Sequence, residues 1–300
     1  MDFVKSPLNY TGGKYKLLPQ IVPLFPENIN TFVDLFGGGF NVGINVEANR
    51  VIYNDLEDHV TQLLCYFNSN EAKDILNEID KVIKEFGLSD TYRHGYEYYG
   101  VTSREGLSNV NREAYYKLRA YYNEHQENPL LFYCMIIFAF SNQIRFNKQG
   151  KFNMPVNKCD FNANMRNNLT KFVDEMHKRN VQFYSNDFRK VDLSMLTEDD
   201  IVYCDPPYLI TCATYNEQDG WNMQDERDLL DLLDKLNDRG VKFALSNVFE
   251  NKGLENVVLK EWSSKYNVHY LDSNYGNCNY HAKDKSKDTT IEVLITNYKK

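Results

Sequence analysis

Short apolar runs recur before residue 60 and again after residue 180, and each has the length of a buried strand. The predicted strands are residues 31–36, 51–55, 181–188, 201–208, 241–247 and 289–298. The segment 223–240 has a helical period instead, and Gly240 stands where such a helix should end. Its apolar face carries Leu229, Leu230, Leu233 and Leu236. Strands alternating with helices predict an α/β fold with a mostly parallel, doubly wound, Rossmann-like sheet.

The middle of the chain lacks these strand-like runs. Tyr-rich segments such as NREAYYKLRAYYNEH (111–125) predict helices there. The apolar segment LLFYCMIIFAF (130–140) is too short to span a bilayer and predicts a buried core helix. We therefore expect a mainly helical insertion at 61–169 within a catalytic domain formed by 1–60 and 170–300.

Composition narrows the class of protein. The chain has 300 residues, of which 42% are hydrophobic and 25% charged, as is typical of soluble globular proteins. Its six cysteines show no metal-type spacing, and the first ten residues lack the apolar core of a secretory signal. We expect a cytoplasmic protein with no metal site and no membrane partner. The net charge of −8 does not exclude nucleic acid, because a basic footprint acts locally.

A glycine-rich turn, VDLFGGGFNVG (33–43), follows the first predicted strand, where open α/β sheets bind nucleotide-like ligands. Val42 breaks the dinucleotide spacing, and TGGKYK (11–16) is not a phosphate-binding loop, which argues against an NAD-dependent oxidoreductase. Asp55 ends the next predicted strand. It suits the hydroxyls of a ribose, or it caps the following helix, and the sequence leaves both open. A ribose-containing, cationic ligand without phosphates, such as S-adenosylmethionine, fits this pattern.

The ordered set NYTGGKYKLL, FVDLFGGGFNVG, YNDL, FNKQGKFNMPVN, YSNDF and YCDPPY resembles the Dam-type class of DNA adenine-N6 methyltransferases. The resemblance covers nearly the whole chain, in the order methyl-donor motif, target-recognition insertion, catalytic motif. The chain departs from the class in two places. Tyr10 and Thr11 stand where Trp and Ala are frequent, and Phe40 stands where a small residue is frequent.

The segment YCDPPY assigns the chemistry. Two prolines end the predicted strand abruptly after Asp205, because each lacks an N–H and fixes φ. The Asp205 carboxylate and the Pro206 carbonyl can each accept one N–H of the adenine N6 amine, which aims its lone pair at the methyl donor. Tyr208 offers a face for stacking the flipped base, and Pro207 helps to hold the backbone rigid. A turn that merely ends a strand is the alternative.

The resemblance further implies a set of donor-binding residues. Each has a structural alternative: Phe36 as core, Lys14 as a solvated surface charge, and Asp187 as a turn residue. The implied residues are Tyr10, Lys14, Asp34, Phe36, Gly38, Gly39, Asp55, Asp187, Phe188 and Asp205.

A basic segment at 145–166 is the expected contact to double-stranded DNA, since its cations can bind phosphates while Arg and Asn can read base edges. Asp160 is its one acid. The segment HAKDKSKD (281–288) is a second, weaker candidate. The predicted contact residues are Arg145, Asn147, Lys148, Lys151 and Asn153.

The predicted function is site-specific adenine-N6 methylation of DNA, in a restriction–modification system with a cognate endonuclease, or as an orphan or phage enzyme. An N4-cytosine methyltransferase is the nearest alternative, although that class usually has Ser before P-P-Y. A non-catalytic DNA-binding regulator is the alternative from another class, and it would need neither Asp205 nor Lys14. The recognition sequence is not predicted, G-A-T-C being only the family's best-known target.

Overall fold

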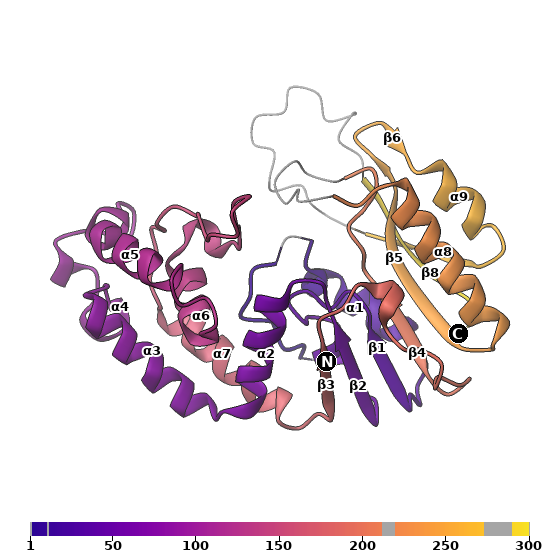
Figure 1. The fold of residues 1–300 in the computed structure, drawn as a ribbon, viewed down its shortest axis with the longest axis horizontal. Coiled ribbons are helices and arrows are strands. Elements are labelled where there is room, and N and C mark those ends of the chain that lie inside the picture. Colours follow the sequence, from indigo (N-terminus) through magenta and orange to yellow (C-terminus); the bar gives the residue numbers. More distant parts are fainter. Residues whose placement is uncertain (1, 11, 212–219, 273–289, 300) are drawn as a thin grey trace. The chain divides into compact units, whose positions relative to one another are not determined.

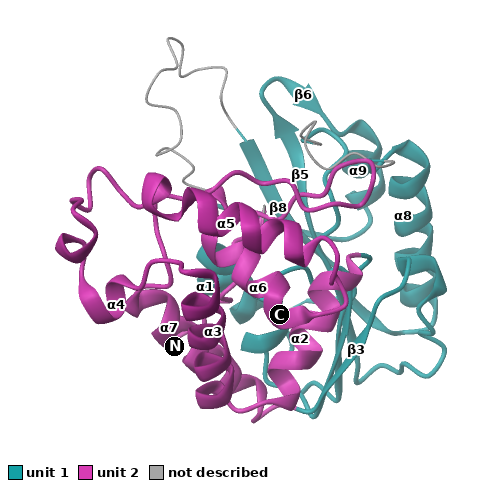
Figure 2. Cartoon of the chain, turned by 60° about the vertical axis from the view of Figure 1, so that its left-hand side comes forward, with its two compact units in different colours: residues 1, 14–56, 180–300 teal, residues 2–13, 57–179 magenta. Residues whose placement is uncertain are grey.

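The computed structural model describes residues 2–10, 12–211, 220–272 and 290–299. The chain divides into two compact units (Figure 2). The first, called here the sheet unit, comprises Lys14–Leu56 and Asn180–Lys300, and the second, the helical unit, comprises Asp2–Gly13 and Glu57–Arg179.

A central sheet organises the sheet unit (Figure 1). Its described strands are β1 (Thr31–Asp34), β2 (Arg50–Asn54), β3 (Val181–Tyr184), β4 (Ile201–Cys204), β5 (Lys242–Asn251), β6 (Leu254–Glu255), β7 (Asn267–Leu271) and β8 (Thr290–Thr296). They lie in the order β3-β2-β1-β4-β5-β8-β7, with β6 paired to β5. The pairs from β3 to β5 are parallel, whereas β8 is antiparallel to both β5 and β7. The predicted α/β, Rossmann-like fold is confirmed.

Helices cover the sheet because their apolar faces pack onto its buried strands. Helices α8 (Met223–Asp238) and α9 (Val257–Ser263) contribute leucines to a core shared with β1, β4, β5 and β8. Asn222 and Asp225 form a capping box at the start of α8, and Gly240 follows its end with a φ of 77°. The helix predicted at 223–240 is therefore confirmed. Near α1 (Leu18–Ile21), Phe25 packs its ring against those of Phe32 and Tyr203.

The strand order creates a switch point between β1 and β4. The chain passes from β1 to β2 on one side, and from β4 to β5 on the other. In open α/β sheets the connections then diverge, and a crevice for ligands opens beyond the carboxyl ends of these strands. The register pairs Asp34 with Tyr203, so that the segments following β1 and β4 leave the sheet side by side.

The helical unit is built from α2 (Asp58–Ser69), α3 (Ala72–Phe86), α4 (Thr91–His94), α5 (Ser108–Tyr122), α6 (Pro129–Phe138) and α7 (Ala163–Met176). Residues Leu130–Phe138 of α6 are all buried, which confirms the predicted core helix. No helix in the described part of the chain is both long and apolar enough to cross a membrane.

The units divide the chain at other points than the predicted domain boundaries. The predicted boundary between 169 and 170 falls inside α7, whose buried face packs with the helical unit. The segment Asp2–Gly13 also belongs to that unit, although we placed it in the catalytic domain. Long-range hydrogen bonds explain this: Asn168 donates to the Ser6 carbonyl, and Asn9 donates to the Ser141 carbonyl. A local sequence pattern contains no sign of such contacts.

Candidate active site

The glycine turn after β1 is fixed by residues of β2 and its end. Gly38 has a φ of 48°, which favours glycine, and a Cβ on Gly37 would lie 2.3 Å from the ring of Tyr53. The Tyr53 hydroxyl donates to the Gly38 carbonyl over 2.9 Å, and the Gly38 N–H donates to Asp55 Oδ2 over 2.8 Å. Asp55 therefore braces the turn. The alternative that it caps the next helix is wrong, because Glu57 is the N-cap of α2.

Asp34 is buried at the end of β1 and holds the far side of the same turn. Its Oδ2 accepts the Gly43 N–H over 3.0 Å. Burial raises the pKa of Asp34 to about 7, and the nearby acids Asp205 and Asp55 add to the rise. Gly39 is buried in this turn. A contact of Asp34 or Gly39 with the methyl donor stays a prediction.

Phe40 adopts a backbone conformation that is unusual for a residue with a side chain. Its φ is 60°, and its buried ring packs on the rings of Tyr53 and Phe183. The residue at position 43, beside the Phe40 ring, has to be glycine, because a Cβ on Gly43 would lie 2.4 Å from that ring. The large residue at position 40 is thus accommodated by neighbouring aromatic packing.

Three aromatic rings form a cluster beside the turn. Phe36 and Phe188 have ring centroids 5.3 Å apart, and Trp221 lies 5.7 Å from each of them. Phe188 is buried, while Phe36 and Trp221 are partly buried against the core of the sheet unit. The sequence had singled out Phe36 and Phe188 but not Trp221. The Trp221 indole N–H donates to Glu226, which fixes the ring.

Asp187 acts locally as a turn residue. Its side chain accepts the backbone N–H of Arg189 and caps the short 3₁₀ turn Phe188–Lys190. The Arg189 guanidinium bridges Asp187 to Asp225 and Asp228 of α8. The structural alternative for Asp187 therefore holds, and a contact with donor adenine stays a prediction.

In the turn Asp205–Tyr208, which follows β4, a hydrogen bond joins the side chains of the acid and the tyrosine. The Tyr208 hydroxyl donates to Asp205 Oδ1 over 2.8 Å, and Lys14 Nζ lies 2.8 Å from the same oxygen. Lys14 Nζ also lies 5.0 Å from the centroid of the Tyr208 ring. Burial and the adjacent Asp205 raise the pKa of Tyr208 well above its usual value, so its hydroxyl stays a proton donor. Pro206 is buried and Pro207 is exposed.

Lys14 is 3% exposed, so the alternative that it is a solvated surface charge is wrong. Buried lysines are rare unless an acid compensates them. Cys204, which precedes Asp205, is buried in β4, and burial raises the pKa of its thiol well above the usual value. A neutral thiol is a poor nucleophile, in keeping with chemistry that forms no covalent enzyme intermediate.

Glu292 of β8 is a site residue that the sequence did not reveal. Its Oε1 lies 3.7 Å from Lys14 Nζ, and its side chain is 2% exposed. One signal was present: Glu292 is an acid in the strand TIEVLIT, whose neighbouring residues are apolar. An acid on such a strand is seldom buried without a charged partner.

Tyr10 lies in the helical unit, where its carbonyl accepts the Gly13 N–H over 3.1 Å. The other predicted donor-binding residues lie in the sheet unit. The role of Tyr10 at the donor stays a prediction.

The basic segment of the helical unit forms a hairpin. Phe146 pairs with Phe152, and the Asn147 side chain accepts the N–H groups of Gln149 and Lys151. Lys148 and Lys151 are exposed.

Arg145 and Asn153 face each other across the base of this hairpin. The Arg145 guanidinium donates to the side chain and to the carbonyl of Asn153, over 2.7 and 3.0 Å. These two predicted contact residues thus brace the hairpin.

Two charged residues of the basic segment are buried inside the helical unit. Asp160 is fully buried and accepts hydrogen bonds from Ser89 and Thr91. Arg166 is 7% exposed and pairs with Asp80 over 2.5 Å. Because both side chains are buried, neither belongs to a surface that could bind DNA phosphates. The second basic candidate, 281–288, lies outside the described residues.

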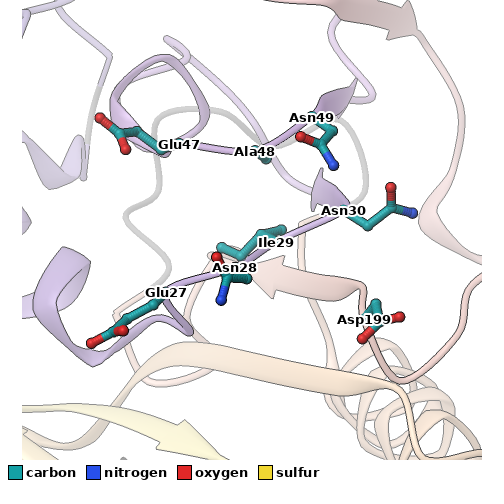
Figure 3. A pocket seen from close by; sticks show the side chains of 8 residues that line it. All are labelled: Glu27, Asn28, Ile29, Asn30, Glu47, Ala48, Asn49 and Asp199. Atoms are coloured by element: carbon teal, nitrogen blue, oxygen red, sulfur yellow. The ribbon is translucent and has the colours of Figure 1, made fainter.

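A hollow lies at the amino ends of β1, β2 and β4 (Figure 3). Asp205 follows the carboxyl end of β4, at the opposite edge of the sheet. Acids and amides line the hollow, among them Glu27, Asn30, Glu47, Asn49 and Asp199. The residues of this amino edge connect the segments that lead into neighbouring strands. Asn30, just before β1, donates its backbone N–H to the carbonyl of Asp199, just before β4. None of the predicted site residues lines this hollow.

The carboxylate and tyrosine after β4 and the glycine turn after β1 follow the two strands that flank the switch point of the sheet. The chain belongs to the family described as D12 class N6 adenine-specific DNA methyltransferase, whose model matches residues 10–277. The Dam-type resemblance is therefore confirmed.

Several curated relatives are similar to this chain. The type II methyltransferase M.FokI of Planomicrobium okeanokoites is 43% identical over 303 residues, and the modification methylase StsI of Streptococcus sanguinis is 44% identical over 304 residues. Each alignment covers 99% of this chain but 43% of the relative, so the chain spans less than half the length of either. The DNA adenine methylase of Escherichia coli (strain K12) is 24% identical over 273 residues, covering 88% of this chain and 86% of its own.

Proposed function

We propose that the protein transfers the methyl group of S-adenosylmethionine to N6 of an adenine that is flipped out of double-stranded DNA. One observation carries this proposal: Asp205, Tyr208 and Lys14 form a bonded cluster beyond the carboxyl end of β4, at the switch point of the sheet. Family membership supports adenine N6 as the acceptor.

The residues near the switch point suit this donor. Asp55 and Asp205 are acids that complement a sulfonium and an ammonium, and the cluster of Phe36, Phe188 and Trp221 suits an adenine ring. S-adenosylmethionine supplies an electrophilic methyl group. We propose that the donor is held by the residues expected from the sequence, namely Tyr10, Lys14, Asp34, Phe36, Gly38, Gly39, Asp55, Asp187, Phe188 and Asp205.

Asp205 and Pro206 prepare the nucleophile in this proposal. The N6 amine is weakly nucleophilic because its lone pair is delocalised into the ring. The Asp205 carboxylate and the Pro206 carbonyl each accept one N–H, so that the lone pair points at the methyl group. Tyr208 stacks against the flipped base. Its 2.8 Å hydrogen bond to Asp205 supports this, because it keeps ring and carboxylate in fixed relation.

We further propose that the helical unit recognises DNA, with Lys148 and Lys151 contacting phosphates. Their exposure at the hairpin supports this assignment. Asn147, Arg145 and Asn153 then shape the hairpin, and their contacts with base edges stay a prediction. The names of M.FokI and StsI favour a modification enzyme that works beside a restriction endonuclease.

The test is methyl transfer from labelled S-adenosylmethionine to unmethylated DNA, followed by nucleoside analysis. N6-methyladenine is the expected product, and label confined to N4-methylcytosine would refute the adenine assignment. Asp205→Ala should fold but lose the activity. Asp231→Ala is the matched control, because Asp231 is an exposed acid of α8 that is not among the predicted site residues. DNA binding without any donor binding in calorimetry would instead support a regulator without catalysis.

A further inference from the structure

We propose that Glu292 is a positioning residue of this site: it shares the Lys14 ammonium with Asp205 and so leaves the Asp205 carboxylate available to the adenine amine. This inference rests on the proposed methyl transfer. It assigns a role to a residue outside the glycine turn and outside Asp205–Tyr208.

The reversed strand β8 brings Glu292 to the site. Because β8 runs antiparallel to β5, its first residues lie at the carboxyl end of β5: Thr290 pairs with Asn251, and Thr296 pairs with Ala244. Glu292 pairs with Val248 on one side and Leu271 on the other, next to a register shift in β5. The early part of β8 therefore lies at the sheet edge where β4 delivers Asp205.

The two acids hold Lys14 differently. Nζ lies 2.8 Å from Asp205 Oδ1, a hydrogen-bond distance, and 3.7 Å from Glu292 Oε1, which is beyond one. Coulomb energy falls as the inverse of distance, so the attraction to Glu292 is about three quarters of that to Asp205 at equal dielectric. The nearer acid is 18% exposed, and the farther acid is 2% exposed. Glu292 is thus the more deeply buried counter-charge.

This sharing matters because Asp205 Oδ1 already accepts from Lys14 and from the Tyr208 hydroxyl. A buried ammonium has to be compensated by an acid. When Glu292 supplies part of that compensation, Lys14 can turn toward it as the N6 amine arrives at Asp205. Without the charge of Glu292, Lys14 would bind Asp205 more tightly and compete with the amine. The loss then falls on the chemical step and not on donor binding.

Glu292→Gln tests this with little change of shape. We expect the single-turnover methylation rate to fall about tenfold or more, and the donor Kd from calorimetry to stay within about twofold. Glu292→Asp keeps the charge at a greater distance and should recover part of the rate. Glu250→Gln is the matched control: it makes the same substitution on β5 and breaks a 2.7 Å ion pair with Lys260 outside the site. Its rate and Kd should match the wild type.

A double-mutant cycle with Lys14→Met separates this role from a structural one. If Glu292 acts through Lys14, adding Glu292→Gln to Lys14→Met should change the rate no further. An equal loss in both backgrounds would assign Glu292 a structural role and overturn the proposal.

The remaining outcomes are also decisive. A wild-type rate in Glu292→Gln overturns the proposal, and so does a weaker donor Kd with an unchanged rate, which would make Glu292 a donor ligand. If Glu292→Gln does not fold, Glu292→Asp replaces it in the double-mutant cycle, and an equal loss of rate in the wild-type and Lys14→Met backgrounds refutes the sharing of Lys14. Wild-type protein that methylates no adenine refutes the proposed function itself, which distinguishes the two failures.

Discussion

Replacing Tyr208 by phenylalanine separates the two roles proposed for this residue, because the ring stays and the hydroxyl is lost. The hydroxyl donates to Asp205 Oδ1 over 2.8 Å. A hydrogen bond to a charged group contributes about 1.5–3 kcal/mol. Lys14 Nζ remains on the same oxygen at 2.8 Å, so we expect the lower end of that range. About 1.5 kcal/mol corresponds to a rate about tenfold lower.

Tyr208→Ala removes the ring as well. Base–aromatic stacking contributes about 1–3 kcal/mol per base, so the combined loss of about 2.5–4.5 kcal/mol should lower the rate about 70- to 2000-fold. The assay is single-turnover transfer of labelled methyl to duplex DNA, which reports the chemical step directly. Equal rates for the Phe and Ala variants would refute the stacking role. A Phe variant as fast as wild type would refute the view that the hydroxyl holds Asp205 during the reaction.

Three other measurements test separate parts of the molecule. Trp221 contacts Phe36 and Phe188, so its fluorescence should change saturably with S-adenosylmethionine in a Trp262→Phe background, and a silent signal would contradict the aromatic donor pocket. Lys148→Ala and Lys151→Ala should each weaken DNA binding and reduce the magnitude of the slope of log affinity against log salt concentration by about one. Fluorescence anisotropy of labelled DNA measures this slope, and an unchanged slope would argue against phosphate contacts. Burial raises the pKa of Asp34 from 3.8 to about 7, so the folded state binds the proton more tightly than the unfolded state. The free energy of unfolding of the wild type, relative to that of Asp34→Asn, should therefore fall by about 1 kcal/mol per pH unit between pH 5 and 7 and level off above pH 7. Urea titrations at several pH values measure this difference. A difference that does not change with pH would contradict the effect of burial on Asp34.

Strands β1 and β4 at the centre of the parallel sheet could be predicted because they are buried on both faces. Such strands read as short, nearly continuous apolar runs, and the prolines after Asp205 mark the end of β4 sharply. The elements β6, α9 and β7 were not predicted. Strand β7 alternates less clearly, with mostly half-buried positions, so its pattern gives a weaker signal than that of a central strand.

Charge along the basic segment was a poor guide to which side chains face solvent. Arg166 forms an ion pair with Asp80, which is far away in sequence, and Arg145 donates hydrogen bonds to Asn153 at the base of the hairpin. Linear counting treats every cation alike, whereas folding removes from the surface those that find a partner. Lys148 and Lys151 stay exposed because the Asn147 turn holds the tip without using their side chains.

The placement of Glu292 depended on strand direction, which its own sequence does not encode. In TIEVLIT, alternation tells which residues share a face, but it does not tell at which sheet edge the strand begins. A parallel β8 would carry Glu292 toward the edge occupied by Glu27 and Asp199, away from Lys14. The antiparallel pairing with β5 reverses this and turns an otherwise costly buried acid into a counter-charge for Lys14. Topology therefore brings the two acids together: β4 delivers Asp205, and a strand of opposite direction delivers Glu292, the second acid near Lys14.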